Sequence, residues 1–204
     1  ITSLEFDHAD IFPTLDDVER AFARLVALVP PHGHLVVWAG AARARRLINE
    51  GGYAGRVTVY DPRPAPGVDL HMARFASLPH GLEFEAVDRG ISLGPMQVPL
   101  WGEFGAANVL AALAAVRDAD LSAAELQRGF ASFAGVHRRM EVRGEPGGIT
   151  VVDDFGHHPT AVEVTLAAAR ERWPGRRLWA VFEPRSATSR RNVFQDAFVQ
   201  ALAK

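Results

Sequence analysis

The sequence predicts an α/β protein: a mixed sheet with helices, followed by the start of a second strand–helix–strand unit. Strand-like and helix-like segments alternate through residues 1–60, which is typical of a parallel sheet with crossover helices. Short segments separated by glycine in residues 70–101 indicate two or three antiparallel strands. The alternation resumes after Gly135, so we expect two units, residues 1–135 and residues 136–204.

Local signals place the elements of the first unit. Residues 1–6 are strand-like, and a helix is expected after Thr14, because acidic residues follow it and apolar residues then recur at helical spacing. Pro30 and Pro31 end that helix. The remaining elements are a buried strand at 35–39, a helix at 40–50, a strand at 56–60, a proline-rich loop at 62–67, the antiparallel strands, and helices at 106–117 and 123–132. Ser122 and Glu125 form a capping box that opens the last of these helices.

The second unit begins with two expected strands, residues 139–143 and 148–152, joined by a turn containing Pro146. Pro159 suits the first position of a helix, because a helix leaves that N–H unpaired. This helix is expected to end near Trp173. A buried strand at 178–182 and a last helix at 191–203 complete the prediction.

Composition excludes several kinds of chemistry. Lys204 is the single lysine, so 21 of the 22 basic residues are arginine, and the chain contains neither a P-loop nor an internal Schiff-base lysine. Cysteine is absent, which excludes disulfides and thiolate metal sites. A net charge of −2 indicates no nucleic-acid partner, and no run approaches the ~20 apolar residues of a membrane span. Because the chain does not begin with Met, we expect a fragment of a longer protein.

The strongest candidate site is the segment Val151–Thr160, where a strand is expected to end, the chain to turn at Gly156 and a helix to begin. Ligands of open α/β sheets bind beyond the carboxyl ends of strands, and helix N-termini attract phosphate. Two aspartates would repel phosphate, so we expect one to hold a ribose hydroxyl or a metal-bound water. The alternative is that these side chains only satisfy the turn and cap the helix.

Three further segments hold candidate groups. Asp7–Asp10 follows a strand-like run, and its histidine and carboxylates suit a hard cation such as Mg²⁺. His137–Arg139 lies at the expected boundary, where an arginine could reach a phosphate held between two domains. Glu183–Ser186 follows the expected strand at 178–182 and suits a carboxylate or phosphate substrate. In each case the alternative is an ordinary solvated loop.

Four segments in this order together resemble the Mur ligase family: residues 5–12, 138–145, 153–160 and 183–186. The Glu-Pro-Arg-Ser sequence of the last segment favours the peptide-adding branch, the murein peptide ligases, over the branch that adds L-alanine. The resemblance implies the later part of a central ATP-binding domain, then the early part of a Rossmann-like C-terminal domain. The P-loop and the UDP-binding domain would lie before Ile1, so residues 1–204 alone would be inactive.

The resemblance also implies roles in nucleotide binding and catalysis. His8 matches a Mg²⁺ ligand, and Arg139 matches an arginine that contacts the phosphates of ATP. Asp154 matches an aspartate that holds the ribose, and His157 a histidine of the nucleotide site. The resemblance therefore names Arg139 and His157 as catalytic and His8 as the metal ligand.

The adenine and acceptor sides are matched less completely. Asn108 matches the second asparagine of the family's His-Asn-x-x-Asn sequence, but Phe104 and Gly105 stand where the histidine and the first asparagine are expected. The adenine contacts of this chain would therefore differ from those of the family. Arg185 and Ser186 fall where the family positions the incoming peptide.

The reaction implied is an ATP-dependent and Mg²⁺-dependent amide synthesis in the bacterial cytoplasm, within peptidoglycan recycling. It would join the tripeptide L-alanyl-γ-D-glutamyl-meso-diaminopimelate to UDP-N-acetylmuramic acid through an acyl phosphate. No nucleic acid, membrane or protein partner is expected. Three alternatives stay open: a ligase that adds L-alanine, a hydrolytic metal site at the Asp/His cluster, and a non-catalytic Mur-like nucleotide-binding protein.

Overall fold

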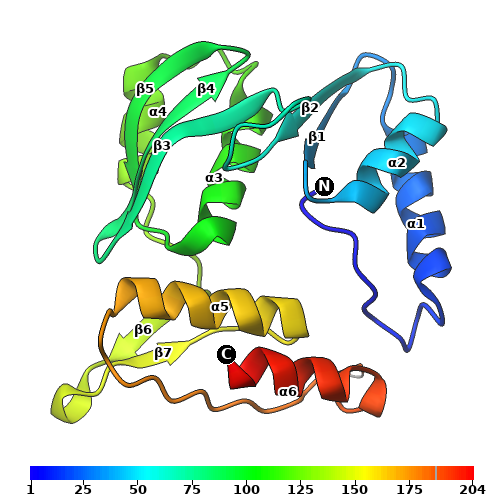
Figure 1. Ribbon diagram of the computed structural model, residues 1–204. Helices are drawn as coiled ribbons and strands as arrows, with labels where there is room; N and C mark the ends of the chain where they lie inside the picture. The colour runs from blue at the N-terminus through cyan, green and yellow to red at the C-terminus, as the bar shows by residue number, and fades with distance from the viewer. Residues whose placement is uncertain (187) are drawn as a thin grey trace.

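A single mixed sheet organises the first part of the molecule (Figure 1). The computed structural model describes residues 1–186 and 188–204. The sheet order is β1-β2-β3-β4-β5. The strands are β1 (His34–Trp38), β2 (Arg56–Tyr60), β3 (Leu70–Leu78), β4 (Gly81–Asp88) and β5 (Ile91–Val98). β1, β2 and β3 pair in parallel, whereas β3, β4 and β5 pair antiparallel, which confirms the predicted mixed sheet.

Four helices accompany this sheet, and together they form what we call the sheet unit. They are α1 (Leu15–Leu28), α2 (Ala42–Glu50), α3 (Gly102–Val116) and α4 (Ala123–Ala131). Thr14 and Ser122 cap α1 and α4 through capping boxes, as expected from the sequence. α3 begins at Gly102, earlier than expected. None of the helices in the described part of the chain combines the length and apolar character that crossing a membrane requires.

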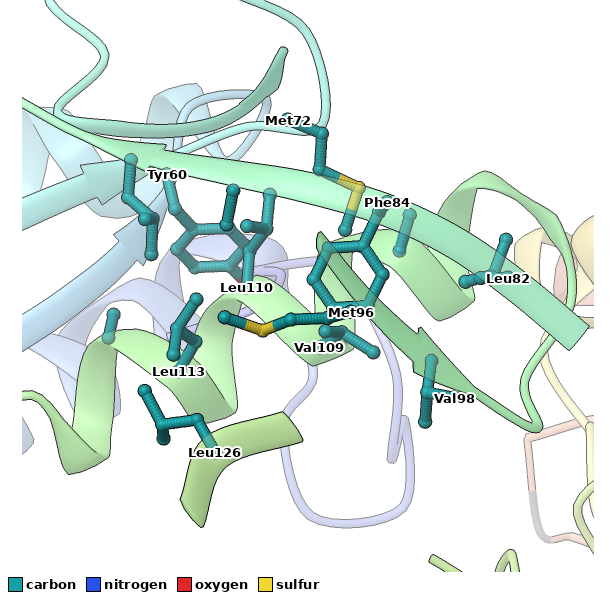
Figure 2. Packing of buried hydrophobic residues seen from close by; sticks show 14 residues of the cluster. Tyr60, Met72, Leu82, Phe84, Met96, Val98, Val109, Leu110, Leu113 and Leu126 are labelled. Atoms are coloured by element: carbon teal, nitrogen blue, oxygen red, sulfur yellow. The ribbon is translucent and has the colours of Figure 1, made fainter. Parts of the chain in front are cut away.

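The side chains of β1 alternate between two cores. Leu35 and Val37 are buried with residues of α1 and α2, whereas Val36 and Trp38 pack toward the larger core beneath α3. Figure 2 shows this larger core, in which Leu110 and Leu113 of α3 lie against side chains of the sheet. The helices therefore cover both faces of the parallel edge of the sheet.

The rest of the chain forms a smaller body, which we call the hairpin unit. β6 (Glu141–Gly144) and β7 (Val151–Asp153) pair antiparallel around the short 3₁₀ helix η1 (Pro146–Gly148). Next come α5 (Pro159–Arg172), the 3₁₀ helix η2 (Asn192–Phe194) and α6 (Gln195–Ala203). Val162 of α5 packs with Phe198 and Ala201 of α6. The predicted hairpin, first helix and last helix are thus confirmed.

Two expected strands are absent from the described residues. Ile1 makes backbone hydrogen bonds to Val36 and Trp38, on both sides of Val37, as a residue of a parallel strand would. The chain after Ile1 leaves the sheet, so the prediction of a strand at 1–6 is wrong. The buried strand at 178–182 is also wrong, because this run is irregular and Val181 is 95% exposed. An apolar run forms a strand only where a neighbouring strand supplies hydrogen-bond partners, and none does so here.

The two units meet where the first turn of α3 packs against α5 (Figure 1). Residues 5–9 also contact the start of α5, and we call these two contacts together the joint. Trp101 and Phe104 join a cluster with Ala168 of α5 and Met140. The guanidinium of Arg172 lies 3.6 Å from the centroid of the Trp101 ring and donates to the Met140 carbonyl at 2.8 Å. Burial at this contact lowers the pKa of the Arg172 guanidinium from its ordinary value.

Leu110→Ala is expected to destabilise the protein by about 2–5 kcal/mol, because Leu110 is 0% exposed and the substitution leaves a cavity under the sheet. Leu28→Ala is the matched control, since Leu28 also lies on a helix but is 80% exposed, and its cost should stay within about 0.5 kcal/mol. Urea unfolding followed by far-UV circular dichroism measures both. Equal losses would contradict the assignment of α3 as the central core helix.

Candidate functional site at the joint of the two units

A segment that we call the strap, residues Glu5–Ala9, crosses from the sheet unit to the hairpin unit. Because Ile1 pairs in parallel with β1 at Val37, the chain continues beyond the carboxyl end of that strand. There Glu5 accepts a hydrogen bond from the Thr160 hydroxyl at 2.6 Å. The strap thus lies at the sheet edge where α/β proteins bind ligands, against the first turn of α5.

His8 sits at a tight turn of the strap. Its φ of 54° is in the left-handed region, and its carbonyl accepts the N–H groups of Ile11 at 2.8 Å and Phe12 at 2.9 Å. The Asp7 carboxylate accepts the His8 backbone N–H at 2.7 Å. The His8 imidazole is 63% exposed, so the turn presents it to solvent with the Asp7 carboxylate beside it.

Asp154 holds the loop that follows β7. Its carboxylate accepts the backbone N–H of Met140 at 2.9 Å and that of Gly156 at 2.7 Å. The nearer guanidinium nitrogen of Arg139 lies 4.0 Å from the same carboxylate. The structure therefore brings Arg139 and Asp154 together. The two hydrogen bonds that Asp154 accepts also stabilise the loop, which is the role that the sequence left open as the alternative to ribose binding.

His157 connects this loop to the strap. Its Nδ1 lies 3.1 Å from the carbonyl oxygen of Phe155, which only accepts, so Nδ1 carries the hydrogen. Nε2 faces the Asp7 carboxylate at 3.6 Å. Asp7, which the sequence did not single out by itself, thus lies between His8 and His157.

The arginines before β6 frame the same loop. The guanidinium of Arg138 lies 4.7 Å from the centroid of the Phe155 ring and that of Arg139 lies 5.7 Å from it. The Glu141 carboxylate accepts the backbone N–H of Arg138 at 2.8 Å. This bond, with contributions from His137 and Arg143, lowers the pKa of Glu141. Arg139 keeps about half of its side chain exposed and remains accessible to an anionic ligand.

The adenine-side candidates lie on α3. Asn108 is exposed on this helix, and Gly105 is buried against the sheet. Phe104 packs into the joint with Met140 and Ala168. The position where a histidine was expected is therefore part of the apolar contact between the units.

The acceptor-side candidates lie in a turn before η2. Arg185 is exposed, whereas the Ser186 hydroxyl accepts the backbone N–H of Ser189 at 3.0 Å. Thr188 is buried, and its hydroxyl accepts the backbone N–H of Ala9 at 2.9 Å. We call Arg185, Ser186, Thr188 and Ser189 the acceptor segment. It touches the strap directly, a contact that no local sequence signal indicated.

A cavity of about 160 Å³ lies at the opposite, amino ends of β1 and β2. Its arginines each face an aspartate: Arg56 with Asp118, Arg117 with Asp88, and Arg89 with Asp69. Because these charges are balanced in pairs, we assign no ligand to this cavity. The candidate site remains the joint.

Two family profiles match the chain on either side of this joint. The Mur ligase middle domain matches residues 1–116, more than half of the chain. The chain belongs to the Mur ligase family. The profile described as Mur ligase, glutamate ligase domain matches residues 138–204 of this Mur ligase chain. The resemblance found in four short segments is confirmed.

Curated relatives of this Mur ligase chain carry two different names. A UDP-N-acetylmuramate–L-alanine ligase of Syntrophus aciditrophicus is 32% identical, over 98% of this chain and 42% of the relative. A UDP-N-acetylmuramate–L-alanyl-γ-D-glutamyl-meso-2,6-diaminoheptandioate ligase of Escherichia coli is 34% identical, over 100% of this chain and 43% of the relative. The chain thus spans less than half the length of either relative, and the two identities do not separate the two activities.

Solved structures support the fold. A murein peptide ligase of Psychrobacter arcticus superposes with a TM-score of 0.63 at 27% identity, covering 98% of this chain and 40% of that one. A UDP-N-acetylmuramate–alanine ligase of Thermotoga maritima gives a TM-score of 0.63 at 18% identity, covering 82% of this chain and 36% of that one. The predicted α/β class with Mur ligase domain folds is confirmed.

The donors around His8 fit Mg²⁺ only as a partial ligand set. In the described part of the chain, no three His, Cys, Asp or Glu side chains gather into a metal-binding group. Mg²⁺ takes few protein ligands and draws others from phosphate and water. The exposed His8 imidazole beside the Asp7 carboxylate fits such an ion. It does not provide the three protein ligands that a hydrolytic metal site needs.

Glu141→Gln should make stability less dependent on pH in the acidic range. The folded-state pKa of Glu141 is lowered from its ordinary 4.5, so its contribution is fully present above pH 4.5 and lost as pH falls through the lower value. Urea midpoints of both proteins between pH 6 and pH 3 check this. A stability gap that stays constant as the solution is acidified would contradict the prediction.

Proposed function

We propose that the protein containing this chain is an ATP-dependent ligase. It would join L-alanyl-γ-D-glutamyl-meso-diaminopimelate to UDP-N-acetylmuramic acid in the bacterial cytoplasm. The observation that supports this most directly is the joint, where Asp7 of the strap lies 3.6 Å from His157 of the hairpin unit. This contact gathers groups suited to a nucleotide and its metal from both sides of one interface.

We assign residues 1–135 to the later part of a central ATP-binding domain and residues 136–204 to the early part of a C-terminal domain. The family profiles leave residues 117–137 unmatched, and this gap contains the proposed boundary. Because the chain has no internal lysine, the P-loop lysine must come from outside these residues. The 204 residues alone are therefore expected to be inactive.

In the proposed reaction, the lactyl carboxylate attacks the γ-phosphate of ATP, which gives an acyl phosphate and ADP. The amine of the incoming peptide then attacks the acyl carbon, and phosphate leaves from a tetrahedral intermediate. Catalysis of this kind depends on positioning and on charge neutralisation. Mg²⁺, when bound near His8, supplies positive charge to the phosphate oxygens.

The residues of the chain then take distinct roles. The half-exposed Arg139 guanidinium neutralises charge that develops on the phosphates. His157, whose ring meets that of Phe155 edge-to-face with centroids 5.2 Å apart, belongs to the same nucleotide site. Asp154 holds a ribose hydroxyl, because its two oxygens have lone pairs beyond those used by Met140 and Gly156. Arg185 contacts the acceptor peptide with Ser186.

The adenine side differs from the family pattern. Phe104 is used in packing, and Asn108 is exposed on the next turn of α3. We therefore propose that Asn108 alone supplies the side-chain contact from α3 to the base. If the full-length protein failed to bind ATP, the non-catalytic Mur-like alternative would replace the ligase.

Ligation of UDP-N-acetylmuramic acid to two acceptors tests the proposed substrate. We expect the full-length protein to release phosphate from ATP with the tripeptide and not with free L-alanine. The L-alanine-adding alternative rests on relatives such as that of Syntrophus aciditrophicus, and it predicts the reverse preference. A mass-spectrometric assay of the UDP-linked product distinguishes the two outcomes.

Arg139→Ala in the full-length enzyme is expected to lower kcat by about 10²-fold, because it removes a positive group from the developing phosphate charge. Arg170→Ala is the matched control, since Arg170 is an exposed arginine of α5 that contacts its own helix. Its kcat should stay within about twofold. Steady-state kinetics measures both, and equal losses would exclude the nucleotide role of Arg139.

A further inference from the structure

The hairpin unit holds the main chain of the strap on both sides of Asp7 and His8. On one side, His158 Nε2 lies 3.2 Å from the carbonyl oxygen of Phe6. On the other, the hydroxyl of Thr188 accepts the backbone N–H of Ala9 at 2.9 Å. These two hydrogen bonds flank the turn that presents the imidazole of His8.

The environment of His158 fixes the direction of its hydrogen bond. As the N-cap of α5, it accepts the backbone N–H of Thr160 through Nδ1 at 3.3 Å. Nε2 therefore carries the hydrogen and donates to Phe6. The ring also meets the Phe194 ring edge-to-face, with centroids 4.9 Å apart. One histidine thus starts the helix and binds the strap.

Thr188 connects the strap to the acceptor segment. Thr188 is 2% exposed, and its carbonyl accepts the backbone N–H of Arg191 at 3.1 Å. The neighbouring Ser189 is fixed by its bond to the Ser186 hydroxyl. A shift of the acceptor segment therefore moves the group that binds Ala9.

We propose that His158 and Thr188 are positioning residues that set the place of His8 relative to His157, and that Thr188 couples acceptor binding to the metal and nucleotide side. This rests on the proposed function, in which His8 serves the metal and Arg185 with Ser186 serve the acceptor. Coupling between two sites is reciprocal, so nucleotide with metal also orders the acceptor segment.

Thr188→Val in the full-length protein removes the hydroxyl while keeping the shape of the side chain. We expect the Ala9 amide to exchange about tenfold faster, as for the loss of one hydrogen bond. We also expect Mn²⁺ affinity in the presence of ADP to fall about tenfold. Thr188→Ser keeps the hydroxyl and should restore both values, which a role in packing alone would not produce.

His158→Asn provides an independent variant. Asparagine caps a helix well but is too short to reach the Phe6 carbonyl, so the helix should keep its thermal stability. The backbone amide resonance of His8 should nevertheless shift, and Mn²⁺ affinity with ADP should fall as in Thr188→Val. A His8 resonance that stays unchanged in both variants would overturn the proposal.

The readouts separate this proposal from the proposed function. If wild-type protein binds no Mn²⁺ with ADP, the proposed function fails, and the exchange of Ala9 and the resonance of His8 still decide whether the strap is held. If the Ala9 exchange rate and the His8 resonance both change in the variants but their Mn²⁺ affinity equals that of wild type, the proposed positioning role toward the metal is wrong.

Discussion

The contact of helix α5 with the sheet unit at both of its ends is the constraint on which the site depends. At its first turn, His158 and Thr160 bind the strap through hydrogen bonds. Toward its last turn, Ala168 and Arg172 pack on the start of α3. Two contacts along one rigid helix fix both the position and the rotation of the hairpin unit. His157, which directly precedes the N-cap of this helix, is thereby held beside Asp7.

Short side-chain contacts then complete the site on this frame. Asp154 closes the loop between β7 and α5 by accepting two backbone N–H groups, and Arg139 is placed beside it. The strained turn at His8 turns an imidazole outward from the strap. Residues far apart in the sequence thus become neighbours because one helix joins two bodies. The same residues provide loop stability and the groups proposed for nucleotide binding.

The sequence predicted the features that neighbouring residues determine, such as helix starts. It missed the features that depend on contacts between segments far apart in the chain. The capping boxes at Thr14 and Ser122 and the proline at the start of α5 were sufficient to place their helices. The run 178–182 has the composition of a buried strand, yet no neighbouring strand pairs with it in the described chain. The contact between Ala9 and Thr188 joins residues 179 positions apart, so spacing could not reveal it. The four short segments still identified the family, because their residues and their order in the sequence are specific enough without any structure.

Because Phe104 of α3 packs against Ala168, the two ends of α5 are held to the sheet unit by different kinds of contact. The end near α3 is held largely by apolar and aromatic contact, whereas the end near the strap combines hydrogen bonds with one edge-to-face contact between Phe6 and Phe194. Apolar contacts weaken on cooling, and hydrogen bonds do not share that dependence. We therefore expect cooling to weaken the contact at α3, the side proposed for the adenine, more than the contact at the strap. An imidazole at residue 104 would make that end more polar and less sensitive to temperature.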